Sequence, residues 1–203
     1  MSILLVRHGE TASNAARILQ TPEIPLSERG LAQADRLAAR LARLGVREIL
    51  SSDYARARMT AERVQAATGA PLEIWPDLRE RNFGALRGRA YAELGFDPFA
   101  ADYAPPEGES WQAFHDRVAR AWPLLLSRAR RLGGNLAVVT HGLVVRAIAE
   151  REVGLGGLDA PLGWQNTSLT VVTSEPPPSV ELLNCIEHLA ELDLEPATST
   201  GRA

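Results

Sequence analysis

Two short apolar runs, one near the start of the chain and one in its second half, each end in a histidine followed by a glycine. The run 3–6 leads into Arg7–Gly9, and the run 136–140 leads into His141 and Gly142. An apolar run without a polar break is typical of a strand that is buried on both faces. Because ligands of parallel α/β sheets bind beyond the carboxyl ends of the strands, the repeated pattern predicts that both imidazoles face one crevice. A cation and the start of a following helix would attract an anion to that crevice.

Phosphoryl transfer is the chemistry that these residue types suit. Arg7 and Arg56 can each grip a phosphate group through two hydrogen bonds. A neutral ring nitrogen of His8 or His141 can attack phosphorus, and Glu80 can supply the proton that a leaving alcohol needs. No metal is required, because guanidinium groups and helix N-termini already neutralise the charge.

Some of the candidate residues also have ordinary structural interpretations. Arg58 can pair with Glu62, four residues further along a helix. Asn14 can be a polar residue on a helix surface, and Glu10 and Glu80 can be solvated carboxylates. Only their positions in the chain favour a functional role.

The composition narrows the class of protein. The 203 residues suffice for one domain with a large core, and the net charge of -3 argues against nucleic-acid binding. All 22 basic residues are arginine, which excludes Schiff-base and P-loop mechanisms because both need a lysine. The single Cys185 excludes an internal disulfide and a multi-cysteine metal site. The run 3–6 is too short for a signal peptide or a membrane span. We therefore expect a soluble cytoplasmic protein, a monomer or homodimer, that binds neither nucleic acid nor membrane.

Strand and helix signals alternate along most of the chain. Gly45 and Gly69 fit the ends of the first two long helices. Residues 168–173 and 180–183 resemble edge strands. The other predicted strands cover 3–6, 46–50, 72–75 and 136–140, and the predicted helices follow Ser27, cover 54–68, open at 109–110 and follow His141. This order predicts an α/β fold: a three-layer α/β/α sandwich with a mainly parallel central sheet and an antiparallel edge.

Residues 77–109 break the alternation, since they are charged, irregular and rich in proline. Long irregular insertions in compact domains are often functional, so we predict a short lid insertion here. Residues 195–203 are predicted to be a disordered tail. The sequence shows no repeat and no second domain, so residues 1–203 are expected to form one domain.

The segment from Leu5 to Thr11, together with Asn14, resembles the signature of the histidine phosphatase superfamily, phosphoglycerate mutase-like branch. The resemblance extends over about residues 3–189. Each piece is short, but the combination and its order are highly specific. Further matching segments, in the family's order, are 25–34, 51–62, 78–84, 108–110, 139–142 and 184–189.

The resemblance implies a role for each matching residue. His8 would become the phosphohistidine, while Arg7, Arg56 and His141 would hold the phosphoryl group. Glu80 would first donate a proton and then activate water. No metal or cofactor is implied. The implied substrate-binding residues are Gly9, Glu10, Thr11, Asn14, Gln20, Thr21, Arg58, Gly142 and Leu143.

Two departures from the family pattern concern substrate binding. Thr21 replaces a usual glycine, and Leu86–Gly88 replaces a usual Trp-Glu-Gly. The span between Glu80 and His141 is also shorter than in the family's mutases, which favours a phosphatase, because an open pocket lets water take the phosphoryl group.

The leading hypothesis is a metal-independent phosphomonoesterase, a histidine acid-type phosphatase acting on a small phosphorylated metabolite. One alternative is a phosphoglycerate mutase that depends on a bisphosphate primer. A binding module for phosphorylated ligands is a second, although binding alone needs no proton donor. A metal hydrolase with His8, Glu80 and His141 as ligands is a third.

Overall fold

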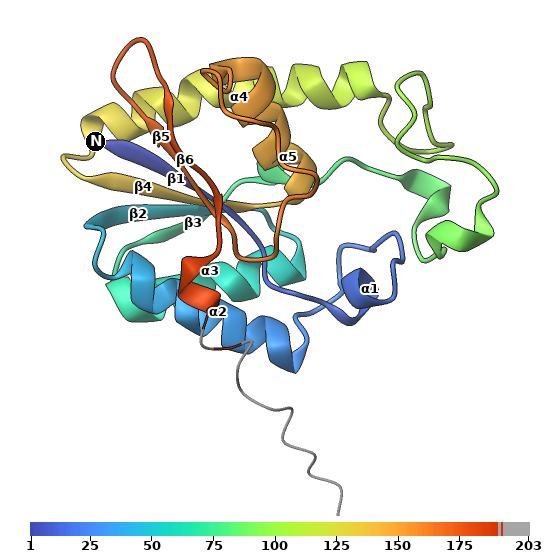
Figure 1. The fold of residues 1–203 in the computed structure, drawn as a ribbon, viewed down its shortest axis with the longest axis horizontal. Coiled ribbons are helices and arrows are strands. Elements are labelled where there is room, and N and C mark those ends of the chain that lie inside the picture. Colours follow the sequence, from blue (N-terminus) through green and yellow to red (C-terminus); the bar gives the residue numbers. More distant parts are fainter. Residues whose placement is uncertain (191, 193–203) are drawn as a thin grey trace, which may run out of the picture.

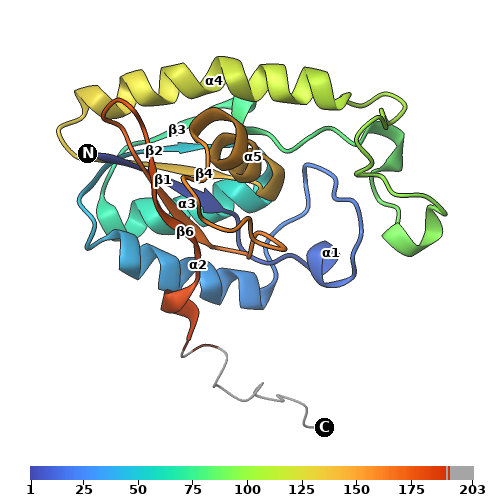
Figure 2. The same ribbon diagram turned by 45° about the horizontal axis from the view of Figure 1, so that its top comes forward.

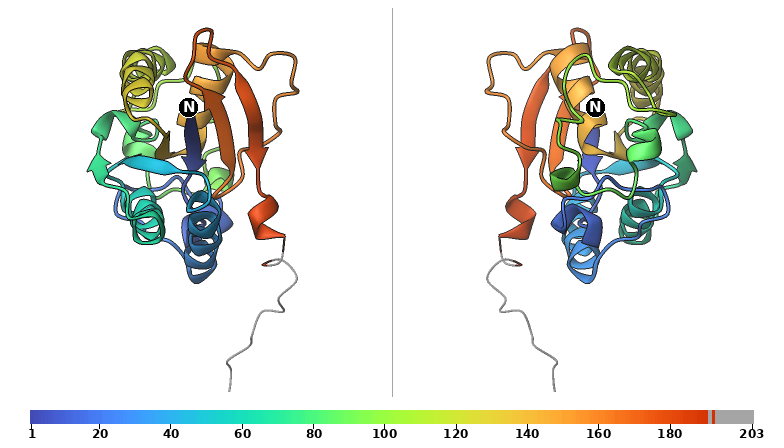
Figure 3. Two further views of the ribbon diagram at one scale, coloured as in Figure 1. Left: turned by 90° about the vertical axis from the view of Figure 1, so that its left-hand side faces the viewer. Right: turned by 90° about the vertical axis from the view of Figure 1, so that its right-hand side faces the viewer.

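A computed structural model, which describes residues 1–190 and 192, has one six-stranded sheet between two layers of helices (Figures 1 and 3). The strand order is β3-β2-β4-β1-β5-β6. The strands are β1 (Ser2–Arg7), β2 (Val46–Ser51), β3 (Leu72–Ile74), β4 (Asn135–Thr140), β5 (Leu169–Thr173) and β6 (Val180–Cys185). β1 to β4 are parallel to one another, and β5 pairs antiparallel with both β1 and β6. The predicted α/β sandwich is therefore confirmed. The predicted tail 195–203 lies outside the described residues.

Helices cover both faces of the sheet (Figures 1 and 2). In β1, Ile3 and Leu5 pack into the core beneath α4 and α5, while Leu4 and Val6 pack toward α2 and α3. This alternation is what a strand buried on both faces requires. The helices are α1 (Ala12–Ala15), α2 (Glu28–Leu41), α3 (Ala55–Thr68), α4 (Trp111–Arg131) and α5 (Gly142–Ala147), which continues into a π-helical segment, Ile148–Val153. Within the described residues, none of these helices has the length and apolar character to cross a membrane.

Polar side chains cap the helices where the sequence offers them. The hydroxyls of Thr11, Ser27 and Ser110 each accept a hydrogen bond from a backbone N–H in the first turn of α1, α2 and α4. Gly69 ends α3 in the left-handed conformation, as predicted. The expected stop at Gly45 is wrong, because α2 ends at Leu41 and short turns follow before Gly45 bends the chain toward β2.

The prediction of two edge strands near the end of the chain is only partly right. β6 lies at the edge, but β5 lies between β1 and β6 and pairs with both. The threonines of β5 suggest an exposed strand in the sequence, yet Thr170 is fully buried. Its hydroxyl accepts a hydrogen bond from the Asn184 N–H at 3.0 Å, so the polar atom is satisfied inside the sheet.

The register of the sheet decides which residues meet at its carboxyl edge. β1 and β4 pair in parallel, with Arg7 beside Thr140, and the His8 N–H donates to the Thr140 carbonyl at 2.9 Å. Residues 77–109 lie beyond this edge, on the same side as α1 (Figure 2). They carry three short 3₁₀ turns, Pro76–Leu78, Gly84–Leu86 and Tyr91–Glu93. A small apolar cluster of Leu19, Phe83, Leu86 and Leu94 packs them onto the loop after α1.

The segment after β1 passes very close to the start of α2. A Cβ atom on Gly30 would lie 2.0 Å from the carbonyl oxygen of Glu10. We therefore expect Gly30→Ala to lower the free energy of unfolding by about 1–3 kcal/mol, the usual cost of overpacking. Urea denaturation measures this change. Gly163→Ala is the matched control, because a Cβ there meets no atom within 4 Å. An equal effect of both substitutions would contradict the close contact.

Candidate active site

The paired ends of β1 and β4 bring His8 and His141 together. Their ring centroids are 5.2 Å apart and the rings meet edge to face at 64°. Both side chains are almost fully buried, with 2% and 0% of their surface exposed. Two imidazoles from segments far apart in the sequence thus share one enclosed position.

The hydrogen bonds of His8 decide which ring nitrogen carries its proton. Nδ1 lies 2.7 Å from the Gly9 carbonyl oxygen, which can only accept, so Nδ1 must donate. Nε2 lies 3.2 Å from Nε of Arg56, which donates to it. Burial first, and then the charges of Arg56 and Arg7, hold the pKa of His8 well below 6.5. The neutral ring therefore presents a lone pair at Nε2.

His141 is held through its Nε2 nitrogen, and the tautomer of His8 recurs here: the proton is on Nδ1 and the lone pair is at Nε2. Its Nε2 lies 2.9 Å from the hydroxyl of Ser52, which in turn accepts the Tyr54 N–H at 3.3 Å. Because the buried Ser52 hydroxyl has no other acceptor among the described residues, it donates to Nε2, which leaves the ring proton on Nδ1. That nitrogen is buried and has no partner among the described residues. Burial and the charge of Arg56 also hold the pKa of His141 well below 6.5.

Two arginines flank the histidines from different elements. Arg7 ends β1 and contacts the Trp164 carbonyl with one terminal nitrogen, while its Nε is buried and unpartnered within the described part of the chain. Arg56, in the first turn of α3, is 2% exposed and donates to the Thr21 carbonyl at 3.0 Å. Burial is also the main cause that lowers the pKa of Arg56 to about 10. Buried donors without partners are costly, so this site is built to receive an anion.

Glu80 reaches the same cavity from the lid. Its two carboxylate oxygens accept the N–H groups of Arg81, at 3.0 Å, and Leu143, at 3.3 Å. Burial raises its pKa in spite of these donors and of the arginines across the cavity. The neighbouring guanidinium groups point elsewhere: Arg79 pairs with Asp53, and Arg81 donates to the carbonyls of residues 98 and 103. A protonated Glu80 is therefore compatible with its surroundings.

A cavity of about 660 Å³ opens over these groups. Of the residues predicted to bind substrate, Asn14, Gln20, Gly142 and Leu143 line it. The catalytic candidates Arg7, His8, Arg56 and Glu80 also line it, and the ring of His141 lies next to that of His8.

Five predicted substrate-binding residues do not line the cavity. Gly9 donates its N–H to Thr60, and Thr11 caps α1. Glu10 accepts from Ser27 and pairs with Arg29, and Thr21 contributes only the carbonyl that holds Arg56. Arg58 is exposed on the outer face of α3 and pairs with Glu62 at 2.8 Å. In the structure Arg58 therefore forms the ion pair with Glu62, four residues further along the helix, that the sequence offered as the alternative to substrate binding.

Several residues that the sequence did not single out line the same cavity. Tyr91 and Phe99 come from the lid and meet edge to face, with ring centroids 5.6 Å apart. Trp164 and Asn166 come from the loop before β5, and Asn166 donates to the His8 carbonyl at 3.0 Å. For Tyr91 and Phe99, the sequence pattern that could have indicated a role in the site is the presence of aromatic residues within the charged lid. No local pattern distinguishes the second pair from ordinary loop residues.

The side chains around the cavity do not form a cluster of metal ligands. Among the residues that the structure describes, no three histidine, cysteine, aspartate or glutamate side chains cluster so that they could hold a metal ion. The groups that converge here are two cations, two neutral imidazoles and one carboxyl group, a set that suits a phosphate ester.

The buried histidines give a prediction for acid stability. Their pKa values in the folded chain lie below the unfolded value of about 6.5, so acid drives protons onto the unfolded chain first. The free energy of unfolding should therefore decrease as the pH is lowered below about 6.5, by up to about 1.4 kcal/mol per pH unit for each histidine. In phosphate-free buffer between about pH 6 and 5, His8→Asn should reduce the slope of the free energy of unfolding against pH. The reduction should approach about 1.4 kcal/mol per pH unit, the contribution of one proton. An unchanged slope would mean that His8 is protonated in the folded chain.

Comparison with known proteins agrees with this geometry. The model of the histidine phosphatase superfamily (branch 1) matches residues 3–185. The chain is 35% identical over 167 residues to a probable phosphoglycerate mutase, GpmB, of Escherichia coli, with 76% of each chain covered. A phosphoglycerate mutase structure from Bacillus anthracis has a TM-score of 0.80 at 27% identity, covering 94% of this chain and 96% of its own. A mycobacterial glucosyl-3-phosphoglycerate phosphatase, in complex with VO3, has a TM-score of 0.78 at 25% identity, covering 91% and 99%. With its fold, its paired histidines and this match over most of its length, the chain belongs to the histidine phosphatase superfamily, branch 1.

Proposed function

We propose that this protein is a metal-independent phosphomonoesterase that hydrolyses a small phosphorylated metabolite through a phosphohistidine on His8. The observation that carries the proposal is the lone pair at His8 Nε2. The Gly9 carbonyl fixes it by accepting the proton of Nδ1, Arg56 Nε donates to it at 3.2 Å, and His8 and Glu80 line the same cavity. A nucleophile and a proton donor on one cavity are what ester cleavage requires.

The first step transfers the phosphoryl group to the protein. Nε2 of His8 forms a bond to phosphorus, and the bond between phosphorus and the ester oxygen breaks. The electron pair of that bond stays on the oxygen, which takes the proton of Glu80 and leaves as an alcohol. Arg7, Arg56 and Nδ1 of His141 are the donors available for the phosphoryl oxygens, and the Gly9 carbonyl stabilises the proton on Nδ1 of the phosphorylated ring.

The second step releases phosphate. Water attacks phosphorus as Glu80, now a carboxylate, accepts a proton from it. The bond between phosphorus and Nε2 breaks, and its electron pair returns to His8. Inorganic phosphate leaves, and both Glu80 and His8 regain their starting protonation states.

The alternative is a mutase, which the names of two similar proteins favour. A mutase must keep water from the phosphohistidine, whereas a cavity of about 660 Å³ exceeds the size of a three-carbon phosphate ester and leaves room for water. This supports the phosphatase. With 3-phosphoglycerate as substrate, the two functions differ in product: inorganic phosphate for the phosphatase, and 2-phosphoglycerate, dependent on a bisphosphate primer, for the mutase.

The nucleophile can be identified by trapping. We expect the wild-type protein to form an acid-labile, base-stable phosphoenzyme, and His8→Ala to form none and to lose turnover. Peptide mapping should place the label on His8. Turnover should persist in EDTA, since the proposed steps use side chains alone. Label on His141, or loss of activity in EDTA that a divalent metal restores, would refute the assignment.

The role of Glu80 can be tested by the leaving group. Glu80→Gln should slow single-turnover release of an alkyl alcohol by about 10²–10⁴-fold, the usual contribution of a general acid, and spare release of nitrophenol from p-nitrophenyl phosphate. In the wild-type protein, alcohol release should fall as pH rises through the raised pKa of Glu80, because only the protonated carboxyl can donate. Equal slowing of both substrates in Glu80→Gln would show that another group is the acid.

A further inference from the structure

The segment that carries Glu80 has almost no regular structure of its own. After the 3₁₀ turn Pro76–Leu78, residues 79–83 form neither helix nor strand. A carboxyl group that must donate a proton to one ester oxygen has to be held within a narrow range of positions. The contacts that hold Glu80 must therefore come from elsewhere in the chain.

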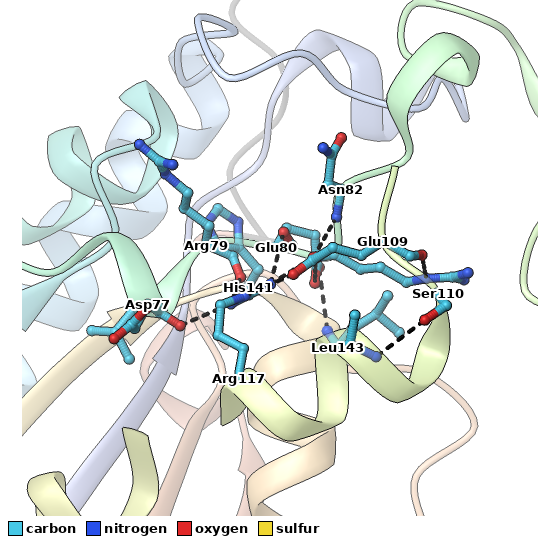
Figure 4. A network of polar contacts seen from close by, with 12 residues as sticks. Asp77, Arg79, Glu80, Asn82, Glu109, Ser110, Arg117, His141 and Leu143 are labelled. Atoms are coloured by element: carbon cyan, nitrogen blue, oxygen red, sulfur yellow. Dashed lines mark hydrogen bonds and ion pairs between the residues drawn. The ribbon is translucent and has the colours of Figure 1, made fainter. Parts of the chain in front are cut away.

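Arg117, on α4, binds the main chain on the N-terminal side of Glu80 (Figure 4). Its Nη1 donates to the carbonyl oxygens of Asp77, at 2.8 Å, and Arg79, at 2.9 Å. One guanidinium nitrogen thus bridges two backbone carbonyls of the segment that leads into Glu80.

Glu109, just before α4, binds the chain on the other side of Glu80. Its Oε2 accepts the Asn82 N–H at 2.8 Å, and its own N–H donates to the Asn82 carbonyl, also at 2.8 Å. The same carboxylate receives Arg117 through two bonds, Nε to Oε1 at 2.9 Å and Nη2 to Oε2 at 2.8 Å. The two side chains are only 13% and 21% exposed, so each needs the other to compensate its charge.

We propose that the Arg117–Glu109 ion pair positions Glu80 as the proton donor to the leaving group. Neither residue lines the cavity over His8, so both are positioning residues. They line the neighbouring cavity, which Glu80 also borders, and therefore act on Glu80 from behind. The inference rests on the proposed function of Glu80. A lysine cannot replace Arg117, because a single ammonium group cannot hold a carboxylate in two bonds and reach two carbonyls as well.

The test compares the leaving-group dependence of five variants, one of which, Arg117→Lys, keeps the positive charge. Arg117→Met removes the cation, and Glu109→Gln removes the charge while nearly preserving the shape, which keeps the test informative if Arg117→Met does not fold. Arg128→Met is the matched control, since Arg128 also forms ion pairs from α4, with Glu48 and Glu73, but does not touch the acid segment. Glu80→Gln tests the proposed function separately. Single-turnover phosphorylation is followed with glycerol 3-phosphate and with p-nitrophenyl phosphate, and folding by thermal denaturation.

Arg117→Met and Glu109→Gln should slow phosphorylation by glycerol phosphate by about 10–100-fold, the cost of misplacing a reacting group, and phosphorylation by nitrophenyl phosphate by less than about threefold. Arg117→Lys should not restore the rate. Arg128→Met should lower thermal stability and leave the ratio of the two rates unchanged. Equal slowing of both substrates by both variants, or no slowing by either, would overturn the positioning role. If Glu80→Gln itself slows both substrates equally, the proposed function of Glu80 fails instead.

Discussion

The parallel pairing of β1 with β4 is the constraint on which the site depends. Val6 lies beside Val139 and Arg7 beside Thr140, and the backbone hydrogen bond from His8 to Thr140 extends the pairing beyond the strand ends. A shift of one residue would turn every side chain of a strand to the opposite face of the sheet, away from the core layer in which it packs. The apolar alternation that stabilises the core therefore also holds the two imidazoles in their mutual position.

Burial then determines the electrostatics of the site. The same loss of solvent that holds His8 and His141 neutral also raises the pKa of Glu80 and lowers that of Arg56. The charges of Arg7 and Arg56 repel each other here, and the buried Nε of Arg7 and Nδ1 of His141 have no acceptor among the described residues. A phosphate dianion, as the proposed function requires, would satisfy those donors and offset the repulsion between the cations.

Two kinds of structure meet over the cavity. The groups proposed to grip the phosphoryl oxygens stand at strand ends and in the first turn of a helix, which are held by the sheet and its cores. The groups that would meet the rest of the substrate stand on loops, including Tyr91, Phe99 and Trp164. Of the sequence departures, Arg87 within Leu86–Gly88 lines the cavity, whereas Thr21 does not, and its carbonyl accepts from Arg56. Loops carried on a rigid sheet can change their contacts with little effect on the core.

Local sequence signals predicted the strands of the sheet, the helix starts after Ser27 and at 109–110, and the charged groups and imidazoles that converge on the cavity. Those features rest on local signals: apolar runs, capping hydroxyls, and charged residues placed directly after a strand. Only the tertiary structure decided that Arg58 points outward, that β5 is an inner strand, and that Trp164 and Asn166 join the site. It also decided that Arg117 and Glu109 hold the acid segment. The orientation of a loop side chain is set by partners far away in the sequence, and no local pattern encodes which partners those will be.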